Sequence, residues 1–400
     1  MNILSNRINS LSESETLAMT QKSRELQALG HNVINLSIGE PDFDTPMEIK
    51  TFAKNAIDDN YSHYTPVSGY MDLRQAICRK LKRDNDLDFK PEQIVVSNGA
   101  KQSLANVVLS LVNPGDEVII PAPYWVSYKE IIKLAEAKAV YINAPIEQDF
   151  KITAQQVEAA ITPKTKLFMF SSPCNPTGSV YTREELKSIA EVIAKHPNIY
   201  ILADEIYELI NFGGKHESIA QFDFIRDKVI TVNGVSKGFA MTGWRIGYLA
   251  APTFIAKACD KLQGQITSAP SSIAQRATLR AMECNPKESA DVKNMLAAFR
   301  ERRDLLISLL KDIPGIKTNQ PQGAFYVFPD VSYYYGKSYE GNVINGGEDL
   351  CMYLLNTVFV ALVSGAAFGD PNCVRFSYAT SNENLIEAVK RIKEALGKLK

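Results

Sequence analysis

Short, mostly apolar runs alternate with helical patterns along residues 90 to 250, and this alternation constrains the fold more than any other feature. The runs are Ile94–Val96, Glu117–Pro121, Leu167–Phe170, Ile199–Ala203 and Val229–Val232. After the first run, Leu104, Val107 and Leu111 repeat at the spacing of one helix face. Strands that alternate with helices pack as a parallel sheet covered by helices, so we expect an α/β fold.

The C-terminal third of the chain has a different pattern. A helical repeat covers residues 290 to 310, and Ala324–Phe328 has the pattern of a strand. A last helical repeat follows Ser381, which can cap a helix. These elements predict a smaller α+β unit. We expect a large domain and a small domain that uses both chain ends, at residues 47–290 and at residues 1–46 with 291–400.

The composition indicates a globular protein that acts on small molecules. The 400 residues are 45% hydrophobic and 22% charged, which is enough to build a large core. The 44 Lys and Arg residues nearly balance the 45 Asp and Glu residues, so no basic field is present to hold nucleic acid. No apolar stretch is long enough for a membrane span, and no secretory signal is recognised, so we expect a cytoplasmic protein.

The cysteines and histidines do not form a metal-binding or disulfide pattern. None of the six cysteines is part of a CxxC pair. None of the four histidines stands near another histidine, or near a paired carboxylate, at a ligand spacing. We therefore expect buried free thiols, no disulfide framework and no metal site.

Polar residues cluster directly after several of the expected strands. These residues are Gly99 to Lys101, Asn175, Asp204, and Ser236 with Lys237. In an open parallel sheet the ligand crevice lies outside the carboxyl ends of the strands. Each residue has a simpler interpretation, because Asn175 suits a turn, Asp204 a helix cap and Lys237 a solvated surface. Taken together, they indicate a cofactor site.

The residue types at this edge favour a small phosphorylated cofactor. A glycine turn before a helix offers backbone N–H groups to a phosphate, and Ser236 and Arg245 can add a hydroxyl and a guanidinium. Arg245 would reach this edge if the next run, Ile246–Ala251, formed an antiparallel strand. No GxGxxG motif and no GxxxxGK motif followed by Ser or Thr occurs. Lys237 can form a Schiff base and Asp204 can keep a pyridine nitrogen protonated, which is the arrangement for pyridoxal phosphate.

Eight ordered strings resemble class I aminotransferases of fold type I, and most of all their bacterial aspartate-type branch. The strings are NLSIGEPDFDTP (Asn35 to Pro46), HYTPVSGYMDLR (His63 to Arg74), GAKQSL (Gly99 to Leu104), PYWVSY (Pro123 to Tyr128), SSPCNPTG (Ser171 to Gly178), ADEIY (Ala203 to Tyr207), VSKGFAMTGWRIGY (Val235 to Tyr248) and VRFSYA (Val374 to Ala379). The resemblance covers nearly the whole chain. It implies a mostly parallel sheet of the seven-stranded type covered by helices, with a smaller α+β domain and a site between the two.

The resemblance assigns most of these residues to pyridoxal 5'-phosphate. It implies that Lys237 binds the cofactor covalently and moves the proton, and that Asp204 pairs with the pyridinium nitrogen. Tyr207 and Asn175 are expected at the phenolic oxygen, and Trp125 is expected to stack on the ring. The implied phosphate site is Gly99, Ala100, Lys101, Ser236 and Arg245, with Tyr64 from a second subunit. A homodimer with shared active sites is therefore implied.

The resemblance also implies how the substrate is held. Arg375 matches the family arginine that grips the α-carboxylate, although an ordinary surface ion pair is the simpler interpretation. Asn175, Trp125 and the Gly39 backbone are expected to complete this grip. The grip would hold the Cα hydrogen over Lys237, so that deprotonation is favoured over decarboxylation.

The choice of amino acid depends on positions that resemble those used for a distal carboxylate, namely Lys101, Ser14 and Thr16. Lys101 also suits a solvated lysine in a first helical turn, and Thr16 suits a helix cap. We expect transfer of an amino group from L-aspartate, or another acidic amino acid, to 2-oxoglutarate by a ping-pong mechanism. Prephenate, which is also a dicarboxylate, and other amino acids stay open as substrates.

Two other functions fit the same scaffold less well. A β-elimination lyase would share the constellation around Lys237 and differ in the step after deprotonation. A regulator that senses amino acids would carry a DNA-binding module, for which we expect no room before Asn35. The tyrosine-rich segment Asp330 to Asn345 matches no family string. Its position is left open, and the border of the pocket is one candidate.

Overall fold

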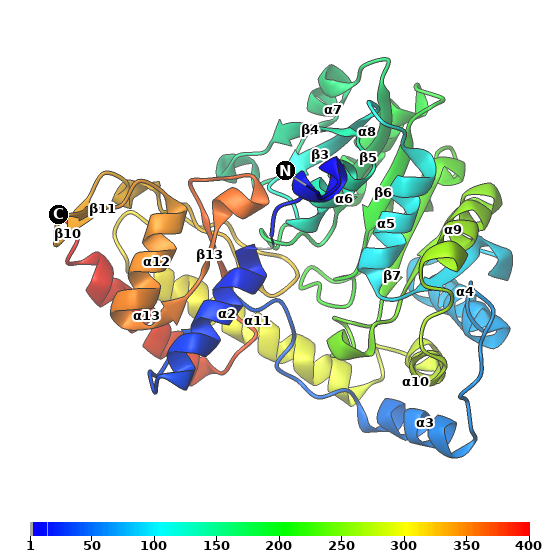
Figure 1. Ribbon diagram of the computed structural model, residues 1–400, viewed down its shortest axis with the longest axis horizontal. Coiled ribbons are helices and arrows are strands. Elements are labelled where there is room, and N and C mark those ends of the chain that lie inside the picture. The colour runs from blue at the N-terminus through cyan, green and yellow to red at the C-terminus, as the bar shows by residue number, and fades with distance from the viewer. Residues whose placement is uncertain (1–2, 14) are drawn as a thin grey trace.

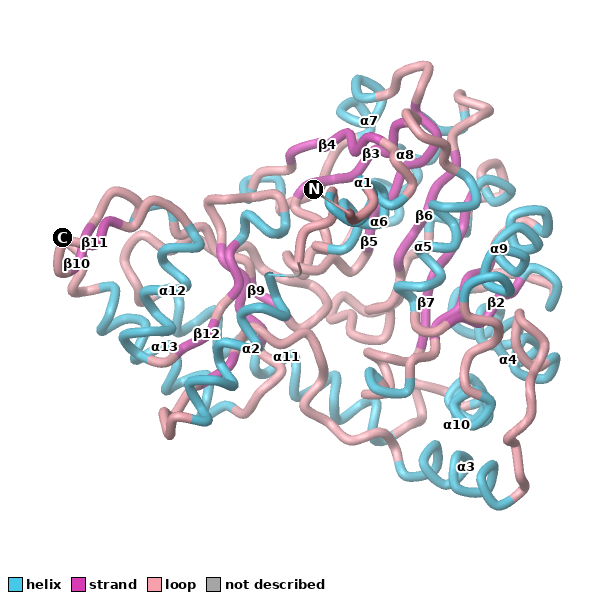
Figure 2. Tube along the Cα trace, in the orientation of Figure 1, coloured by secondary structure: helices cyan, strands magenta, loops and turns pink. Residues whose placement is uncertain are grey.

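A seven-stranded sheet forms the centre of the larger part of the molecule. The computed structural model describes residues 3–13 and 15–400, and its strands appear in magenta in Figure 2. The sheet order is β2-β8-β7-β6-β5-β3-β4. The strands are β2 (Ile94–Ser97), β8 (Gly247–Ala250), β7 (Val229–Gly234), β6 (Tyr200–Asp204), β5 (Thr165–Ser171), β3 (Glu117–Ala122) and β4 (Lys138–Asn143). Within this sheet only β8 is antiparallel to its neighbours, as expected for the strand after Arg245.

Both faces of this sheet are buried because successive residues of a strand point to opposite sides. In β5, Leu167 and Met169 belong to one hydrophobic core, whereas Phe168 and Phe170 belong to the other. The first face packs against α5 (Ala100–Leu111), α6 (Ser127–Leu134) and α9 (Thr253–Ile266). The second face packs against α3 (Met47–Asp58), α4 (Met71–Asn85), α7 (Ala154–Ala160), α8 (Arg183–Ala194) and α10 (Ser272–Glu283). The predicted α/β architecture is therefore confirmed.

The smaller part of the molecule is built from both ends of the chain (Figure 1). Its helices are α2 (Glu15–Ala28), α12 (Gly347–Val358) and α13 (Asn382–Leu396). Its antiparallel sheet has the order β13-β14-β9, with β13 (Val363–Ser364), β14 (Val374–Ser377) and β9 (Tyr326–Val327). Beside it, β1 (Ile34–Asn35) pairs in parallel with β12 (Val360–Ala361).

Helix α11 (Ala290–Lys311) connects the two parts, and Figure 1 shows it running from α10 toward α13. Val292 at its start packs in a core of the large sheet, whereas Phe299 and Leu306 pack in the core of the smaller part. Because one helix contributes to both cores, the domain boundaries expected at residues 46 and 291 stay a prediction. No helix of residues 3–13 and 15–400 is long and apolar enough to cross a membrane.

Two of the differences from the sequence prediction have a clear physical reason. Strand β4 is not predicted because it lies at the edge of the sheet, where only Ile142 of its six residues is buried. The strand predicted at Ala324–Phe328 is shortened to β9, since Ala324 has a left-handed backbone with φ 56°.

Gly247 in β8 lies where the large sheet meets the start of α5. A Cβ atom at this position would lie 2.2 Å from the Ala100 nitrogen and 2.5 Å from the Gly99 carbonyl carbon. These are backbone atoms that cannot rotate away, so we expect Gly247→Ala to lower the free energy of unfolding by about 1–3 kcal/mol, the usual cost of overpacking. Thermal unfolding measures the loss. Gly243→Ala is the control, because nothing lies within 4 Å of its added Cβ, and equal melting temperatures for both variants would contradict this expectation.

Candidate active site

A cavity of about 460 Å³ lies between the two parts of the molecule, at the carboxyl ends of β5, β6 and β7. This volume suits a small cofactor together with a substrate. The predicted residues that line it are Thr16, Gly39, Ala100, Lys101, Trp125, Asn175, Asp204, Tyr207, Ser236, Lys237, Arg245 and Arg375. The fold therefore brings residues from both chain ends and from the middle of the sequence to one place.

Lys237 is the nucleophilic group of this cavity. It follows the end of β7, and its Nζ donates a hydrogen bond to the Gly39 carbonyl oxygen at 2.5 Å. Burial lowers the pKa of Lys237 to about 8, and the positive charges of Arg375 and Arg245 act in the same direction. The neutral form of the amine, which is the form that attacks a carbonyl carbon, is therefore well populated near neutral pH.

Asp204 is a buried carboxylate at the end of β6. The Tyr128 hydroxyl donates to its Oδ2 at 2.8 Å, and the Ile206 N–H donates to its Oδ1 at 3.3 Å. Burial raises the pKa of Asp204 to about 6, while these two hydrogen bonds limit the rise. The carboxylate therefore stays largely ionised at pH 7 and can accept a hydrogen bond from a ligand. Sequence reasoning gave Tyr128 no role, although it ends the string PYWVSY.

An anion-binding corner lies at the start of α5. Gly99 precedes this helix with φ +81°, and no side chain caps the helix. A Cβ atom on Gly99 would lie 2.2 Å from Nη2 of Arg245, so the guanidinium stands directly over the turn. Ser236 and Ala100 line the cavity at the same corner. A helix start, a guanidinium and a hydroxyl together suit a phosphate.

Arg375 on β14 is a buried cation without a carboxylate partner. It is 2% exposed, its Nη1 donates to Asn175 Oδ1 at 2.9 Å, and its Nη2 donates to the Ser37 carbonyl at 2.7 Å. Its Nε has no hydrogen-bond partner, and no described carboxylate forms an ion pair with it. Burial lowers the pKa of Arg375. An uncompensated buried guanidinium is costly, so this geometry calls for an anion from outside the chain.

Two tyrosine hydroxyls meet beside Arg375. Those of Tyr207 and Tyr326 lie 2.8 Å apart, and the ring centre of Tyr326 lies 4.5 Å from the Arg375 guanidinium carbon. Burial raises the pKa of both tyrosines, so both hydroxyls keep their protons. One hydroxyl donates to the other, which leaves one proton of the pair to donate to a ligand. Tyr326 was not predicted as a site residue. The only signal for it was its position in the expected strand Ala324–Phe328.

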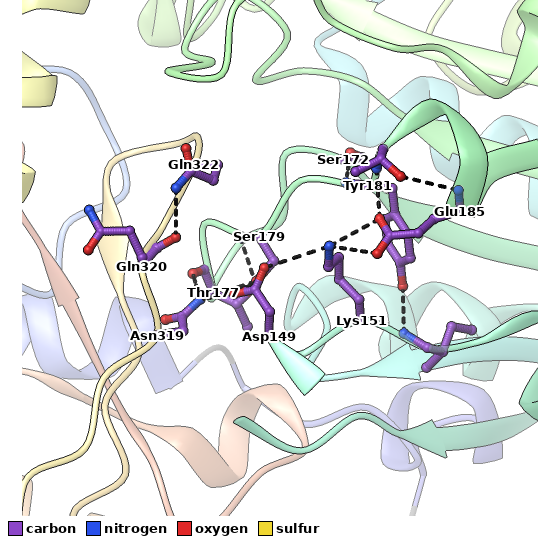
Figure 3. A network of polar contacts seen from close by, with 12 residues as sticks. Asp149, Lys151, Ser172, Thr177, Ser179, Tyr181, Glu185, Asn319, Gln320 and Gln322 are labelled. Atoms are coloured by element: carbon purple, nitrogen blue, oxygen red, sulfur yellow. Dashed lines mark hydrogen bonds and ion pairs between the residues drawn. The ribbon is translucent and has the colours of Figure 1, made fainter. Parts of the chain in front are cut away.

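The turn that carries Asn175 is fixed by a polar network, shown in Figure 3. Asn319 Nδ2 donates to Asp149 Oδ1 at 2.8 Å and to the Thr177 carbonyl at 3.2 Å. The Gly178 carbonyl accepts the backbone N–H groups of residues 322 and 323. The loop before β9 therefore locks the turn in place, which holds Asn175 against Arg375.

Lys101 and Thr16 lie on other walls of the cavity. Nζ of Lys101 lies 5.0 Å from the ring centre of Trp125. Burial and the nearby charge of Arg245 lower the pKa of Lys101. Thr16 lies in the first turn of α2 and faces the cavity, whereas Ser14 lies outside the described residues.

Gly99 does not line the cavity but precedes Ala100 at its corner, and two other predicted features lie away from it. Tyr64 is fully exposed and lines a separate surface hollow of about 330 Å³ with residues such as Thr65 and Pro270. The segment Asp330 to Asn345 does not line the cavity, so the pocket border is not its position. It holds the hairpin of β10 (Ser338–Tyr339) and β11 (Asn342–Val343), which Figure 1 shows beside the C-terminus.

A reactive amine at the carboxyl edge of a parallel sheet, facing a buried guanidinium, defines an α/β enzyme that acts on a small anionic substrate. Comparison with known proteins identifies the family to which this enzyme belongs. Residues 31–392 match the family described as aminotransferase class I and II. The chain belongs to the class I and II aminotransferase family, and the resemblance found in the sequence is confirmed.

Individual relatives match nearly the whole chain. It is 48% identical to the bifunctional aspartate aminotransferase and glutamate/aspartate-prephenate aminotransferase of Petunia hybrida, over 99% of this chain and 83% of that protein. It is 46% identical to the aspartate/prephenate aminotransferase of Cereibacter sphaeroides, over 98% of both chains.

Solved structures agree with these sequence relatives. The aspartate aminotransferase from Rhizobium meliloti superposes with a TM-score of 0.95 at 40% identity, over 99% of both chains. The aspartate aminotransferase from Thermus thermophilus with maleate superposes with a TM-score of 0.93 at 39% identity, over 99% of this chain and 100% of that chain. These neighbours confirm the fold type I architecture.

The lowered pKa of Lys237 predicts unusual reactivity. With a pKa of about 8, roughly half of its amine is neutral at pH 8, whereas an ordinary lysine with a pKa of about 10.4 has under about 1% neutral amine there. We expect reductive methylation of the cofactor-free protein, followed by peptide mass spectrometry, to show half-maximal labelling of Lys237 near pH 8. Exposed lysines in the same sample are the internal control. Labelling of Lys237 that follows theirs at every pH would contradict the lowered pKa.

Proposed function

We propose that this aminotransferase moves the amino group of L-aspartate, or of another acidic amino acid, to 2-oxoglutarate with pyridoxal 5'-phosphate as its cofactor. One observation carries the proposal: the buried, unpaired guanidinium of Arg375 faces the same cavity as the buried amine of Lys237. An amino acid offers the carboxylate that Arg375 lacks. The relatives from Petunia hybrida and Cereibacter sphaeroides are named for aspartate and prephenate, which supports an acidic substrate.

The residues at the carboxyl edge fit the proposed cofactor. The helix start at Gly99, with Ser236 and Arg245, would hold the phosphate. Asp204 would pair with the pyridinium nitrogen, and Trp125 would stack on the ring. Asn175 and Tyr207 would donate to the phenolic oxygen. When bound, the cofactor supplies an electron sink for the bond that breaks at the substrate Cα.

The chain itself then positions the substrate and moves the proton. Arg375 and Asn175 orient the α-carboxylate, so the Cα hydrogen faces the amine of Lys237. Lys237 takes this proton and returns it to another atom, a role that suits an amine with a pKa of about 8. The Tyr326 hydroxyl would donate to that of Tyr207 and so hold the Tyr207 hydroxyl in position beside the carboxylate grip.

A second part of the cavity wall, away from the Arg375 grip, would select a second carboxylate in this proposal. Lys101 supplies a cation there, and Thr16 supplies a hydroxyl from α2. A dicarboxylate would be held at both ends, which excludes apolar amino acids by leaving the Lys101 charge unpaired. The Thermus thermophilus relative was solved with maleate, itself a dicarboxylate. Prephenate is a second candidate substrate, because the Cereibacter sphaeroides relative is named for it.

We also propose that two copies form a homodimer, with Tyr64 reaching the phosphate corner of the partner. Its complete exposure, away from the cavity of its own chain, supports this proposal. The site would then lie between a large domain, residues 47–290, and a small domain, residues 1–46 with 291–400. The cytoplasmic location expected from the sequence stays a prediction.

The proposal is tested by absorbance. The purified chain with pyridoxal 5'-phosphate should show a visible band of the lysine-bound cofactor, which L-aspartate bleaches. After aspartate is removed, 2-oxoglutarate should restore the band. A band that never forms would overturn the cofactor assignment, and a band that aspartate leaves unchanged would overturn the acidic amino donor.

Lys237→Ala removes both the cofactor link and the base. We expect kcat to fall by at least about 10³-fold, within the range for loss of a positioned acid–base group, and the visible band to be lost. Circular dichroism should match that of the unmodified protein, because the side chain that is removed lines the cavity and is not part of a hydrophobic core. Normal turnover in this variant would contradict the proposed mechanism.

Lys101→Ala tests the carboxylate selectivity. We expect kcat/KM to fall about 10- to 100-fold for L-aspartate, the loss of one charge-assisted hydrogen bond, with a much smaller fall for an apolar amino acid. Lys138→Ala is the control, because this lysine lies on the edge strand β4 with a 71% exposed side chain. Equal losses for both substrates in Lys101→Ala would assign Lys101 to the cofactor or to structure instead.

A further inference from the structure

The turn after β6 has two faces. Asp204 and Tyr207 line the cavity, whereas Glu205 and Glu208 lie behind it and are 3% and 7% exposed. The backbone N–H of Glu208 donates to the Glu205 carbonyl at 2.9 Å and closes the turn. Contacts that fix the positions of the two glutamates therefore also fix the positions of Asp204 and Tyr207.

Two side chains that come after the turn in the sequence lie against Glu205, Ser218 by a hydrogen bond and His216 at ion-pair distance without one. The Ser218 hydroxyl donates to Glu205 Oε1 at 2.6 Å. Nε2 of His216 lies 3.2 Å from Glu205 Oε2, and both side chains are buried. Along the sequence His216 shows no ligand or ion-pair spacing, so the fold alone creates this pair.

Glu208 has a separate set of partners on α4. Nζ of Lys80 forms a buried ion pair with its Oε1, and Asn85 Nδ2 donates to its Oε2 at 3.1 Å. Lys80 also donates to Asn85 Oδ1 at 2.9 Å. The ammonium of Lys80 therefore compensates the charge of Glu208.

Other charged and titratable groups also lie around Glu205, Glu208 and His216. They are Arg83 and Asp84 on α4, Tyr248 on β8, and Tyr128, Tyr207 and Lys237 around Asp204. Arg83 Nε donates to Asp84 Oδ1 at 2.7 Å, and burial keeps Tyr248 protonated by raising its pKa well above the usual value. Among the described residues, His216 is thus the cation that faces Glu205.

The charge of Glu205 acts on the site because it is the neighbour of Asp204. Burial is the main cause of the raised pKa of Asp204, and the carboxylate of Glu205 raises it further. Burial lowers the pKa of His216, but Glu205 and Glu208 outweigh this effect, so the pKa is raised overall. His216 therefore keeps its proton to a higher pH than a free histidine does.

We propose that His216 and Glu205 are a positioning pair, in which protonated His216 neutralises Glu205 and so keeps Asp204 ionised for the cofactor nitrogen. This inference rests on the proposed function, since it needs pyridoxal 5'-phosphate as the ligand of Asp204. Neither residue touches the cavity. Their effect reaches the ligand only through Asp204.

The test measures how tightly the cofactor-free protein binds pyridoxal 5'-phosphate as the pH changes. Affinity should fall in acid as Asp204 takes up a proton, with its pKa of about 6. His216→Gln leaves Glu205 uncompensated, so the midpoint of this fall should move up by about one pH unit. Binding should then be about fivefold weaker at the original midpoint, and the difference should approach about tenfold well below it. The ligand is the same throughout, so differences between variants report on the protein.

The double variant separates an effect of charge on the midpoint from an effect of altered structure. His216→Gln with Glu205→Gln removes both members of the pair and should return the midpoint to that of the unmodified protein. Glu205→Gln alone should not raise the midpoint. Glu117→Gln is the matched control, because Glu117 is also buried and paired, with Thr162 at 2.6 Å and Lys138 at 3.3 Å, but lies at the opposite end of the strands.

The outcomes are distinct. An unmoved midpoint in His216→Gln, or equal weakening in both single variants and the double variant, would overturn the positioning pair. If His216→Gln does not fold, a raised midpoint in Glu205→Gln overturns it and an unraised one supports it. If the unmodified protein binds no pyridoxal 5'-phosphate at any pH, the proposed function fails instead.

Discussion

The constraint on which the structure depends is that parallel strands end at one edge of the sheet. Asp204 ends β6 and Lys237 follows β7, so the parallel direction of the two strands alone brings both residues to this edge. Strand β8 is antiparallel, which brings its start, and Arg245 before it, to the same edge. Gly247 and Gly99 have no side chain at the point where β8 meets α5, and only this lets the guanidinium stand over the helix start. The corner that suits a phosphate is therefore a consequence of the strand directions.

The smaller part of the molecule supplies a buried charge that the large sheet lacks. Arg375 is held from three sides, by Asn175, by the Ser37 carbonyl and by the ring of Tyr326. These partners are neutral, so they fix the guanidinium without neutralising it. The substrate carboxylate would complete the charge balance. A site built in this way stabilises the assembly of the two parts when the substrate binds.

Local rules explain which features could be predicted from the sequence. Thr182 and Glu185 form a capping box at the start of α8, a feature that can be recognised in a sequence because it needs only residues three positions apart. The core strands were predicted because both faces are buried and their apolar runs are continuous. Tyr326 could not be predicted as a site residue, since only the antiparallel pairing of β9 with β14 brings it to Arg375. The same is true of His216, whose partner Glu205 is reached through the fold and not through spacing.

Burial acts in opposite directions on the two ionisable groups that matter most. It lowers the pKa of Lys237 to about 8 and raises that of Asp204 to about 6, so both groups titrate close to neutral pH. Lys237 has cations as neighbours, which favours the neutral amine. Asp204 instead has Glu205 beside it, which would favour the neutral acid and remove the partner of a pyridinium nitrogen. A cation behind the turn therefore helps to keep Asp204 ionised, together with the hydrogen bonds from Tyr128 and Ile206, and His216 is the group that the fold places there.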